Sequence, residues 1–169
     1  MVGKGYHIAL TREHAKRVFN QLDDAALRAF LHELITSPEM NKSGRVLDIG
    51  TCWNAIHRCV TDGDLDPGGG EFPLNHLILG GKELHKGDDY AATLIRPDIT
   101  TFVAEALNEI REPEFREKFF ALDPESYGMP IDEKAFLAVW LAITNLRVFF
   151  DAAAENLEAV IFTAKFKDD

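Results

Sequence analysis

The chain has 169 residues, of which 46% are hydrophobic and 27% are charged, and its formal net charge at pH 7 is -10. This composition is typical of a folded domain and excludes a disordered chain, and the length predicts a single domain over residues 1–169. The negative charge disfavours nucleic acid and membrane surfaces as partners. A basic protein or a small molecule is the expected partner.

Residues 1–10 lack the basic segment and the long apolar run of a secretory signal. The most apolar stretch, residues 135–150, is shorter than the about 20 residues that a membrane span needs. We therefore expect a cytoplasmic protein. Cys52 and Cys59 would lie about 10 Å apart on a helix, which is beyond the reach of a disulfide, so both are expected to be buried free thiols.

The two ends of the chain are predicted to form neighbouring strands. Side chains alternate between two faces in residues 5–10 and again in residues 160–166, and this period of two is typical of a strand. In the first of these segments, Tyr6, Ile8 and Leu10 share one face. We expect the last strand to lie beside the first, which would bring the two ends of the chain together.

Two helices are expected after the first strand. Thr11 and Asp23 can each accept a hydrogen bond from the free amides of a first helical turn, so a helix is predicted to begin after each of them. The second helix is expected to end at Ser37, because the residue before a proline is disfavoured in helical geometry. Residues 40–44 are predicted to form a polar turn.

The segment 45–63 concentrates the residue types that carry chemistry, with a Trp, a His and two Cys in a short strand, turn and helix. We expect a strand at residues 46–49 and a helix at 51–61. The following loop, residues 62–73, contains three consecutive glycines at 68–70 and is predicted to act as a mobile flap.

The second half of the chain adds a short strand or helical turn at residues 74–79, a strand at 91–96, a helix beginning at Pro97 and a short helix after Pro113. Residues 132–156 form the longest predicted helix, and apolar side chains cover nearly its whole circumference, which indicates a buried helix. The sequence therefore predicts an α/β (mixed α+β) fold: a small mixed sheet covered by helices in a three-layer-like arrangement.

The segment VLDIGTCWN is similar to the first nucleotide-binding loop of methyltransferases that use S-adenosylmethionine. Those loops need alternating glycines, so that the backbone amides can approach the ligand closely. Here Gly50 is present, but Cys52 and Asn54 occupy the places of further glycines, and their side chains would fill the ligand's space. We therefore disfavour a methyltransferase.

Motifs for metal binding are incomplete. Asp62, Asp64 and Asp66 begin like a calcium loop, but Pro67 and Pro73 stand where that loop needs a glycine and a glutamate. The six histidines show no HxxxH or HExxH spacing, and the two cysteines form no CxxC motif. We predict no metal site and no cofactor.

Trp53 and His57 are four residues apart and would share one face of a helix. In one interpretation His57 is an acid-base or hydrogen-bonding group and Trp53 a stacking platform, in a site completed by Asp48 and Tyr127 beneath the glycine loop. In the other, which we favour, both side chains belong to the core and His57 is satisfied by a backbone carbonyl or by Asp48.

Four segments together resemble the YfbM-like family, a bacterial domain of unknown function: LDIGTCWNAIHRCVTDG, PLNHLILGGKEL, ATLIRPDITTFVAEAL and YGMPIDE. The most specific part is a core in which Leu47, Asp48, Ile49, Trp53 and His57 occupy the family positions. The chain departs from the family pattern in having Ile56 before the histidine, Gly50-Thr51 in place of Asp-Lys, and Arg96 in place of a helix-capping Thr. The resemblance implies a compact sheet with packed helices and no established activity.

Two hypotheses about function follow. The chain lacks a complete catalytic constellation, so we favour a non-catalytic binding or interaction protein, of a regulatory or immunity type, whose acidic surface contacts a basic partner. The alternative is a small-molecule binder or an enzyme with a site around Asp48, Trp53 and His57, covered by the glycine loop.

Overall fold

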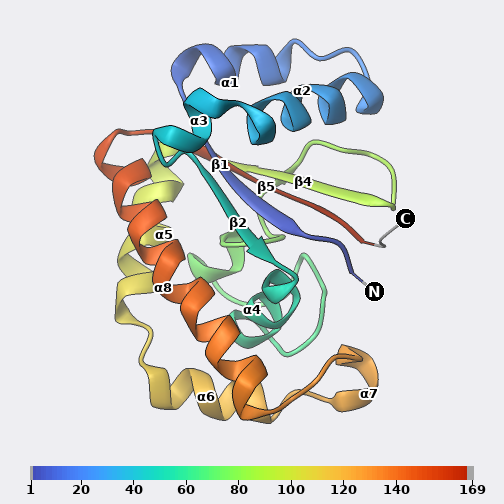
Figure 1. The fold of residues 1–169 in the computed structure, drawn as a ribbon, viewed down its shortest axis with the longest axis vertical. Coiled ribbons are helices and arrows are strands. Elements are labelled where there is room, and N and C mark those ends of the chain that lie inside the picture. The colour runs from blue at the N-terminus through green and yellow to red at the C-terminus, as the bar shows by residue number, and fades with distance from the viewer. Residues whose placement is uncertain (1, 167–169) are drawn as a thin grey trace.

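The computed structural model describes residues 2–166, and the strands in this range form one antiparallel sheet (Figure 1). The order of strands across the sheet is β2-β1-β5-β4-β3. Their bounds are Gly5–Leu10 for β1, Val46–Gly50 for β2, Lys82–Glu83 for β3, Tyr90–Ile95 for β4 and Ala159–Lys165 for β5. The mixed α+β class is confirmed, although the sheet is antiparallel rather than mixed, because the chain reverses direction between neighbouring strands.

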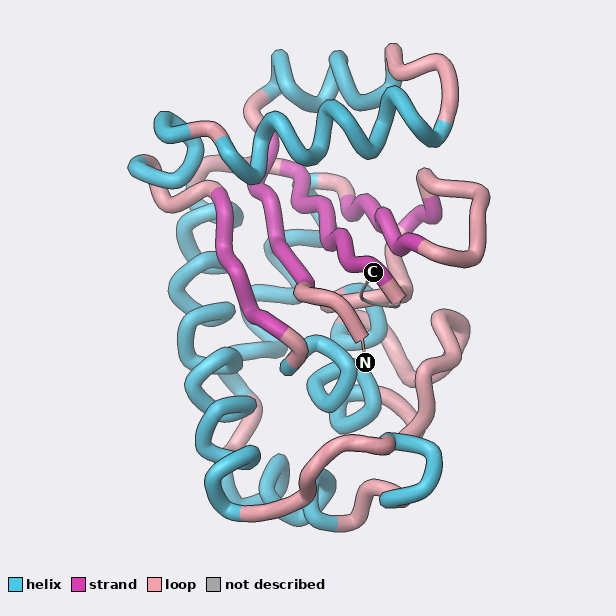
Figure 2. The backbone as a smooth tube through the Cα atoms, turned by 45° about the vertical axis from the view of Figure 1, so that its right-hand side comes forward, coloured by secondary structure: helices cyan, strands magenta, loops and turns pink. Residues whose placement is uncertain are grey.

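Helices cover both faces of the sheet. Helices α1 to α3 lie on one face, α4, α5 and α8 pack on the other, and α6 and α7 lie at the lower end of the view in Figure 1. Figure 2 shows the strands between α1 and α2 on one side and the helices of the larger core, α4, α5 and α8, on the other. The bounds are Arg12–Phe19 for α1, Asp24–Thr36 for α2, Pro38–Lys42 for α3, Cys52–Val60 for α4, Pro97–Glu109 for α5, Glu112–Phe120 for α6, Pro124–Tyr127 for α7 and Glu133–Glu155 for α8, with a 3-10 turn at Leu74–His76.

The first and last strands are neighbours, as predicted. Tyr6 on β1 lies opposite Thr163 on β5, and His7 lies opposite Phe162. Successive side chains of a strand point to opposite faces, so the pair of strands contributes to two separate cores. The larger core lies between the sheet and α4, α5 and α8, and the smaller lies between the sheet and α1 to α3.

The predicted helix starts are confirmed. Thr11 Oγ1 accepts a hydrogen bond of 3.2 Å from the His14 amide, and Asp23 Oδ1 accepts one of 2.8 Å from the Ala26 amide. Both side chains satisfy amides that have no partner within the first helical turn. Helix α2 ends before Pro38, also as predicted.

The polar turn expected at residues 40–44 is wrong in part, because a short helix, α3, occupies Pro38–Lys42. Proline is favoured in the first turn of a helix, where its missing N–H is not needed. Ser37 then caps the new helix by accepting a hydrogen bond of 3.3 Å from the Met40 amide. The proline that ends α2 therefore also begins α3.

Helix α8 is buried on one side only, so the prediction of a helix buried all round is wrong. Phe136, Ile143 and Phe150 are fully enclosed, whereas Leu137 and Leu141 are more than half exposed. Its inner side packs on α4 and α5, which leaves the outer side in contact with solvent. This helix is long and apolar enough to cross a membrane by length and composition, contrary to our expectation, but core helices of soluble proteins also pass that test.

Candidate functional site

Trp53 and His57 are fully enclosed on α4. The Trp53 indole donates a hydrogen bond of 2.8 Å from Nε1 to the Gly3 carbonyl, and its ring packs against Phe162. The His57 ring donates from Nε2 to the Asp66 carbonyl oxygen at 2.9 Å. Burial lowers the pKa of His57, so the ring is neutral at pH 7. These contacts agree with the core interpretation of both side chains.

Asp48 and Tyr127 do not join His57 in a site. Asp48 is exposed on β2, where it accepts a hydrogen bond from the Gly50 amide and forms a 3.5 Å ion pair with Lys4. Tyr127 is buried on α7, and burial is the main cause that raises its pKa to about 12. Within residues 2–166, no hydrogen bond, ion pair or ring contact links Asp48, Trp53, His57 and Tyr127 to one another.

The glycine loop at residues 62–73 is fastened by its own carboxylates. Asp62 Oδ2 accepts a hydrogen bond of 2.9 Å from the Gly70 amide, and Asp66 Oδ1 accepts one of 2.9 Å from the Gly68 amide. The aspartates that resembled a calcium loop therefore bind backbone amides. Among residues 2–166 no group of three or more potential metal ligands comes together.

Arg58 connects α4, the glycine loop and α7 through hydrogen bonds, and no motif in the sequence predicted this role. Its guanidinium is buried and donates to Asn54 on the same helix, to the Gly63 carbonyl in the loop and to Ser126 on α7. The two cysteines are free, as predicted, but only Cys59 is buried, since Cys52 is partly exposed at the start of α4; burial raises the pKa of Cys59 to about 12. A thiol with this pKa is not reactive at pH 7.

A cavity of about 550 Å³ lies between α2 and the sheet, on the face opposite to Trp53 and His57, and Asp48 lies beside it through its ion pair with the lining residue Lys4. We call it the α2 pocket. Strands β1, β4 and β5 form its floor and α2 forms one wall. The lining residues are Gly3, Lys4, Tyr6, Arg28, Ala29, His32, Ile35, Tyr90, Thr163, Ala164 and Lys165.

Three basic residues line the α2 pocket although the chain carries a net charge of -10, and two of them, Arg28 and Lys4, pair with the carboxylates of Asp89 and Asp48. Lys4, Arg28 and Lys165 line it, and its described lining includes no Asp or Glu. Arg28 lies over the Tyr90 ring, 4.6 Å from the ring centroid, and Nη1 donates a hydrogen bond of 2.7 Å to Asp89. Stacking on Tyr90 and pairing with Asp89 both fix the orientation of the guanidinium.

The floor of the α2 pocket contains three hydroxyl groups. Tyr6 and Tyr90 are half-buried, and Thr163 is 1% exposed. Burial raises the pKa of Tyr90, while interactions with Thr163, Arg28 and Lys165 act in the opposite direction. The Thr163 side chain forms a hydrogen bond with Tyr90 that lowers the Tyr90 pKa, and among residues 2–166 the buried Thr163 Oγ1 has no further hydrogen-bond partner.

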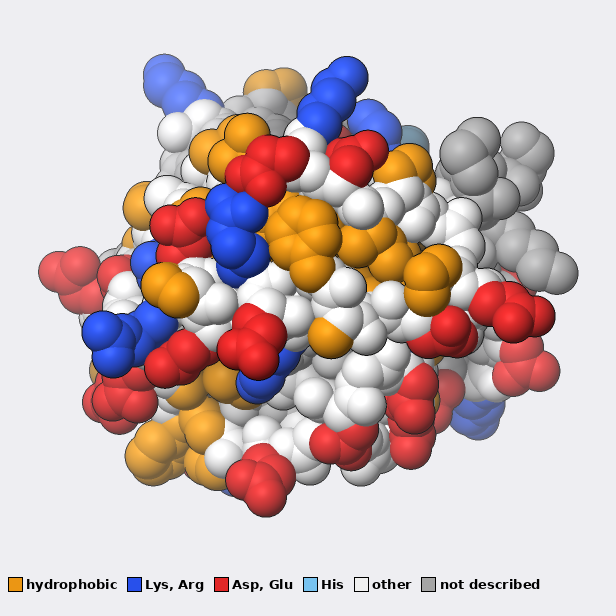
Figure 3. Space-filling model, turned by 90° about the horizontal axis from the view of Figure 1, so that it is seen from below, with side chains coloured by type: hydrophobic (Ala, Val, Ile, Leu, Met, Phe, Trp, Pro, Cys, Tyr) orange, Lys and Arg blue, Asp and Glu red, His pale blue; other side chains and the backbone are white. Residues whose placement is uncertain are grey.

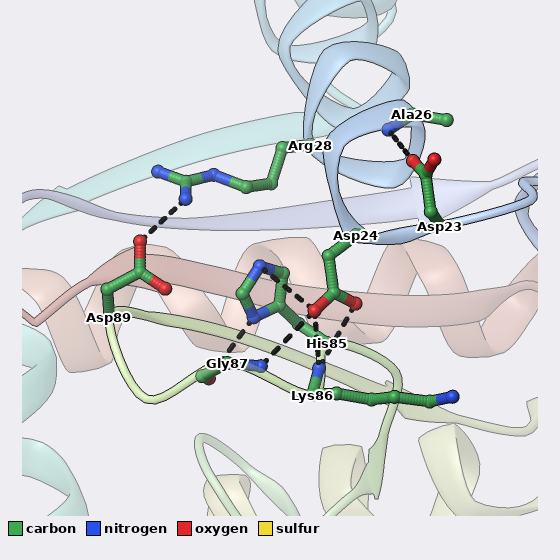
Figure 4. A network of polar contacts seen from close by, with 8 residues as sticks. All are labelled: Asp23, Asp24, Ala26, Arg28, His85, Lys86, Gly87 and Asp89. Atoms are coloured by element: carbon green, nitrogen blue, oxygen red, sulfur yellow. Dashed lines mark hydrogen bonds and ion pairs between the residues drawn. The ribbon is translucent and has the colours of Figure 1, made fainter.

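Polar contacts hold the helical wall of the α2 pocket against the loop that precedes β4 (Figure 4). Asp24, at the start of α2, accepts hydrogen bonds of 3.1 and 3.2 Å from the Lys86 amide and one of 3.2 Å from the Gly87 amide. The buried His85 ring lies beneath it, with Nε2 3.8 Å from Asp24 Oδ2. The pocket is therefore built from fixed elements on two sides.

The sequence did not reveal the α2 pocket, because its residues lie far apart along the chain. Tyr6, Arg28, Tyr90 and Thr163 come from four different elements and belong to no local motif. One signal was present: the alternation in residues 5–10 placed a tyrosine on the same face as two aliphatic residues. Ile8 and Leu10 on that face belong to the smaller core, whereas Tyr6 is half-buried and lines the pocket.

Comparison with known proteins identifies the family. The model of a family described as a domain of unknown function, DUF1877, matches residues 1–163. The fold is similar to that of the crystal structure of YfbM from Escherichia coli, a protein of unknown function, with a TM-score of 0.67 and 18% identity over 97% of this chain and 99% of that chain. No curated relative matches. The resemblance inferred from the sequence is confirmed, and the chain belongs to the DUF1877 family.

Proposed function

We propose that this protein is a non-catalytic binding protein and that the α2 pocket binds a small organic anion. The observation that carries the proposal is the gathering of Lys4, Arg28 and Lys165 around one cavity, without an acidic residue among its described lining residues. An excess of one sign of charge in a cleft raises the local concentration of ligands of the opposite sign.

The size and lining of the pocket favour a small molecule over a macromolecule. Its volume of about 550 Å³ lies within the range of about 300–1,000 Å³ that is usual for small-molecule sites. Ile35, Ala29 and Ala164 supply apolar surface beside the cations. An acid with a compact apolar body would satisfy both parts of this lining.

Titration calorimetry with two probes of similar size tests the proposal. Benzoate carries the charge that the pocket favours, and benzyl alcohol does not. We expect benzoate to bind more tightly than benzyl alcohol, and Arg28→Gln to weaken benzoate binding about tenfold, because a charge-assisted hydrogen bond is lost. Equal affinity for the two probes, or no binding of either, would contradict the proposal.

Arg96→Gln is the matched control for the Arg28 variant. Arg96 is exposed, pairs with Asp98 at 3.0 Å and lines a different cavity. The control removes the same charge from the protein, so it separates a local contact from the general effect of net charge. Benzoate binding should be unchanged in this variant.

A basic protein partner is a second candidate, and one surface favours it. The lower end of the molecule carries acidic side chains around a central apolar strip (Figure 3). Exposed acidic residues on α6, α7 and the start of α8 are Glu112, Glu114, Glu117, Glu125 and Glu133. Acidic groups around apolar surface suit a partner with basic residues around an apolar patch.

Affinity capture at low and high salt tests this second candidate. A specific partner should be lost at high salt, because exposed charge pairs are screened. The double variant Glu114→Lys/Glu117→Lys should also lose it, whereas Glu13→Lys/Glu33→Lys on α1 and α2 should retain it. Retention that depends on neither salt nor the first variant would count against a basic partner.

A further inference from the structure

We propose that the outer side of α8 binds a second copy of this chain. The α8 helices of the two copies pair antiparallel, so that Lys134 of one copy lies opposite Glu155 of the other, and the product is a symmetric dimer. The inference goes beyond the anion site and does not depend on it, because α8 and the α2 pocket lie on opposite faces of the sheet.

The outer side of α8 is apolar and exposed along three turns of the helix. Leu137, Leu141 and Val148 are 55%, 60% and 69% exposed, and their spacing places them on one face of α8, along the side of the molecule in Figure 1. The other exposed residues between positions 137 and 148 are Ala138, Thr144 and Asn145. We call this surface the α8 stripe. Its exposed side chains carry no charge, and a contiguous surface of this kind indicates an interaction site.

Each end of the α8 stripe is followed by an exposed charge that has no partner within the copy. Lys134 and Glu155 form no ion pair and no side-chain hydrogen bond with any residue between 2 and 166. Asp151, one turn before Glu155, is already bound by Asn108 Nδ2 at 2.8 Å. The two unpaired charges have opposite signs and lie roughly 30 Å apart along the helix axis, so they cannot pair within one copy.

An antiparallel second copy of α8 brings these opposite charges together. With a two-fold axis between positions 144 and 145, Lys134 faces Glu155 of the second copy, and Leu141 faces Val148. Each match occurs twice, because both copies supply both members of the pair. Parallel helices would instead place Lys134 against Lys134 and Glu155 against Glu155. The charges therefore favour the antiparallel arrangement.

The middle of the α8 stripe also suits a protein interface better than a lipid surface. The Thr144 hydroxyl donates to the Trp140 carbonyl at 3.1 Å, so burial of this hydroxyl does not remove its hydrogen bond. Thr144 of one copy faces Asn145 of the other, and the hydroxyl oxygen can accept a hydrogen bond from the amide. Helices that lie on membranes carry several basic residues beside the apolar face, whereas the exposed acids of α8 outnumber Lys134.

Sedimentation equilibrium over about a hundredfold range of protein concentration tests the proposal. We expect a reversible equilibrium between monomer and dimer in the wild type. Leu141→Gln should weaken dimerisation at least about tenfold, because each dimer buries this side chain twice. Leu22→Gln is the matched control, since Leu22 is 96% exposed and lies outside α8, and it should leave the equilibrium unchanged. Thermal unfolding shows that each variant is folded.

Charge reversal tests the antiparallel pairing. Lys134→Glu and Glu155→Lys should each weaken their own dimer about tenfold, because each places two pairs of like charges at the interface. An equimolar mixture of these two variants should dimerise as strongly as the wild type, because the mixed dimer restores two pairs of opposite charge. The matched control mixes Lys16→Glu with Glu13→Lys, which make the same changes in net charge at exposed positions of α1. These two variants should dimerise like the wild type, both alone and mixed.

Three results would overturn the proposal. The first is a wild type that stays monomeric at every concentration, and the second is a dimer that Leu141→Gln leaves intact. The third is a mixture of Lys134→Glu and Glu155→Lys that dimerises no more strongly than either variant alone. A monomeric wild type that floats with vesicles of phosphatidylcholine and phosphatidylglycerol, when Leu141→Gln does not, would assign the α8 stripe to a membrane instead. Benzoate binding is measured separately, so failure of the dimer leaves the anion site standing.

Discussion

The indole of Trp53 donates its hydrogen bond to the carbonyl of Gly3, fifty residues earlier in the chain. This bond fixes the start of β1 on α4. The next glycine, Gly5, lies so close to Trp53 that a Cβ at this position would come within 2.7 Å of indole Cδ1. The tryptophan that looked like a stacking platform is thus a packing residue, with no room for a ligand ring.

Trp53→Ala should therefore lower the free energy of unfolding by about 3–5 kcal/mol, as expected for a large buried aromatic side chain. Chemical denaturation measures the change. Phe102→Ala is a suitable control, because Phe102 is about half exposed on α5 and its removal should cost less than Trp53→Ala. A loss of less than about 1 kcal/mol in Trp53→Ala would contradict the core assignment.

The buried His7 should make stability depend on pH. Burial among Phe149, Phe150 and Phe162 lowers its pKa from 6.5 to about 4, and the hydrogen bond to the Leu77 carbonyl offsets this only in part. Between these two pKa values the unfolded chain binds a proton that the folded chain does not. The contribution of neutral, buried His7 to the free energy of unfolding is therefore fully present above about pH 6.5 and is lost as the pH is lowered towards 4.

Urea denaturation at pH 7 and pH 5 measures this effect. His7 should account for a loss of roughly 2 kcal/mol over that interval, from 1.36 kcal/mol for each pKa unit. His57 adds a change of the same sign, because burial lowers its pKa too. His7→Leu should have a shallower dependence on pH than the wild type, and an unchanged slope would show that His7 is not the titrating group.

Thr163→Val should not destabilise the protein, although Thr163 lies in the middle of the sheet. The variant removes a buried hydroxyl whose contact with Tyr90 falls outside strict hydrogen-bond geometry, and it keeps a β-branched side chain on the strand. We expect a gain of about 1 kcal/mol in the free energy of unfolding. A loss of that size would show that the hydroxyl forms a stabilising hydrogen bond in solution.

Leu157→Gly should also stabilise the protein. Leu157 follows α8 with a φ of 53°, in the left-handed region that glycine adopts without steric cost, and its side chain is 73% exposed. Relief of this strain should add about 1 kcal/mol to the free energy of unfolding. Leu157→Ala retains a Cβ, so it should give no comparable gain in thermal unfolding experiments.

Much of the fold could be predicted from local signals. Thr11 and Asp23 marked helix starts, and the alternation of residues 160–166 marked the strand that pairs with β1. The exposed side of α8 could not be predicted in the same way. Apolar side chains around a helix indicate burial, but which of them are covered depends on the arrangement of α4 and α5 around it.

The candidate site was harder to predict than the fold. The segment 45–63 drew attention because its unusual residues are close in sequence, yet Trp53 and His57 are used for packing. The α2 pocket is assembled from residues such as Arg28 and Thr163, which only the topology of the sheet brings together. No spacing rule relates such residues before the strand order is known.

Backbone NMR during a titration with benzoate tests the central claim most directly, because it reports where the acid binds. We predict saturable shifts of amide signals in α2 from Arg28 to Ile35 and around Tyr6, Tyr90 and Thr163, which need about tenfold more acid for saturation in Arg28→Gln. Shifts centred on Trp53 and His57 instead, or no saturable shifts at all, would contradict it.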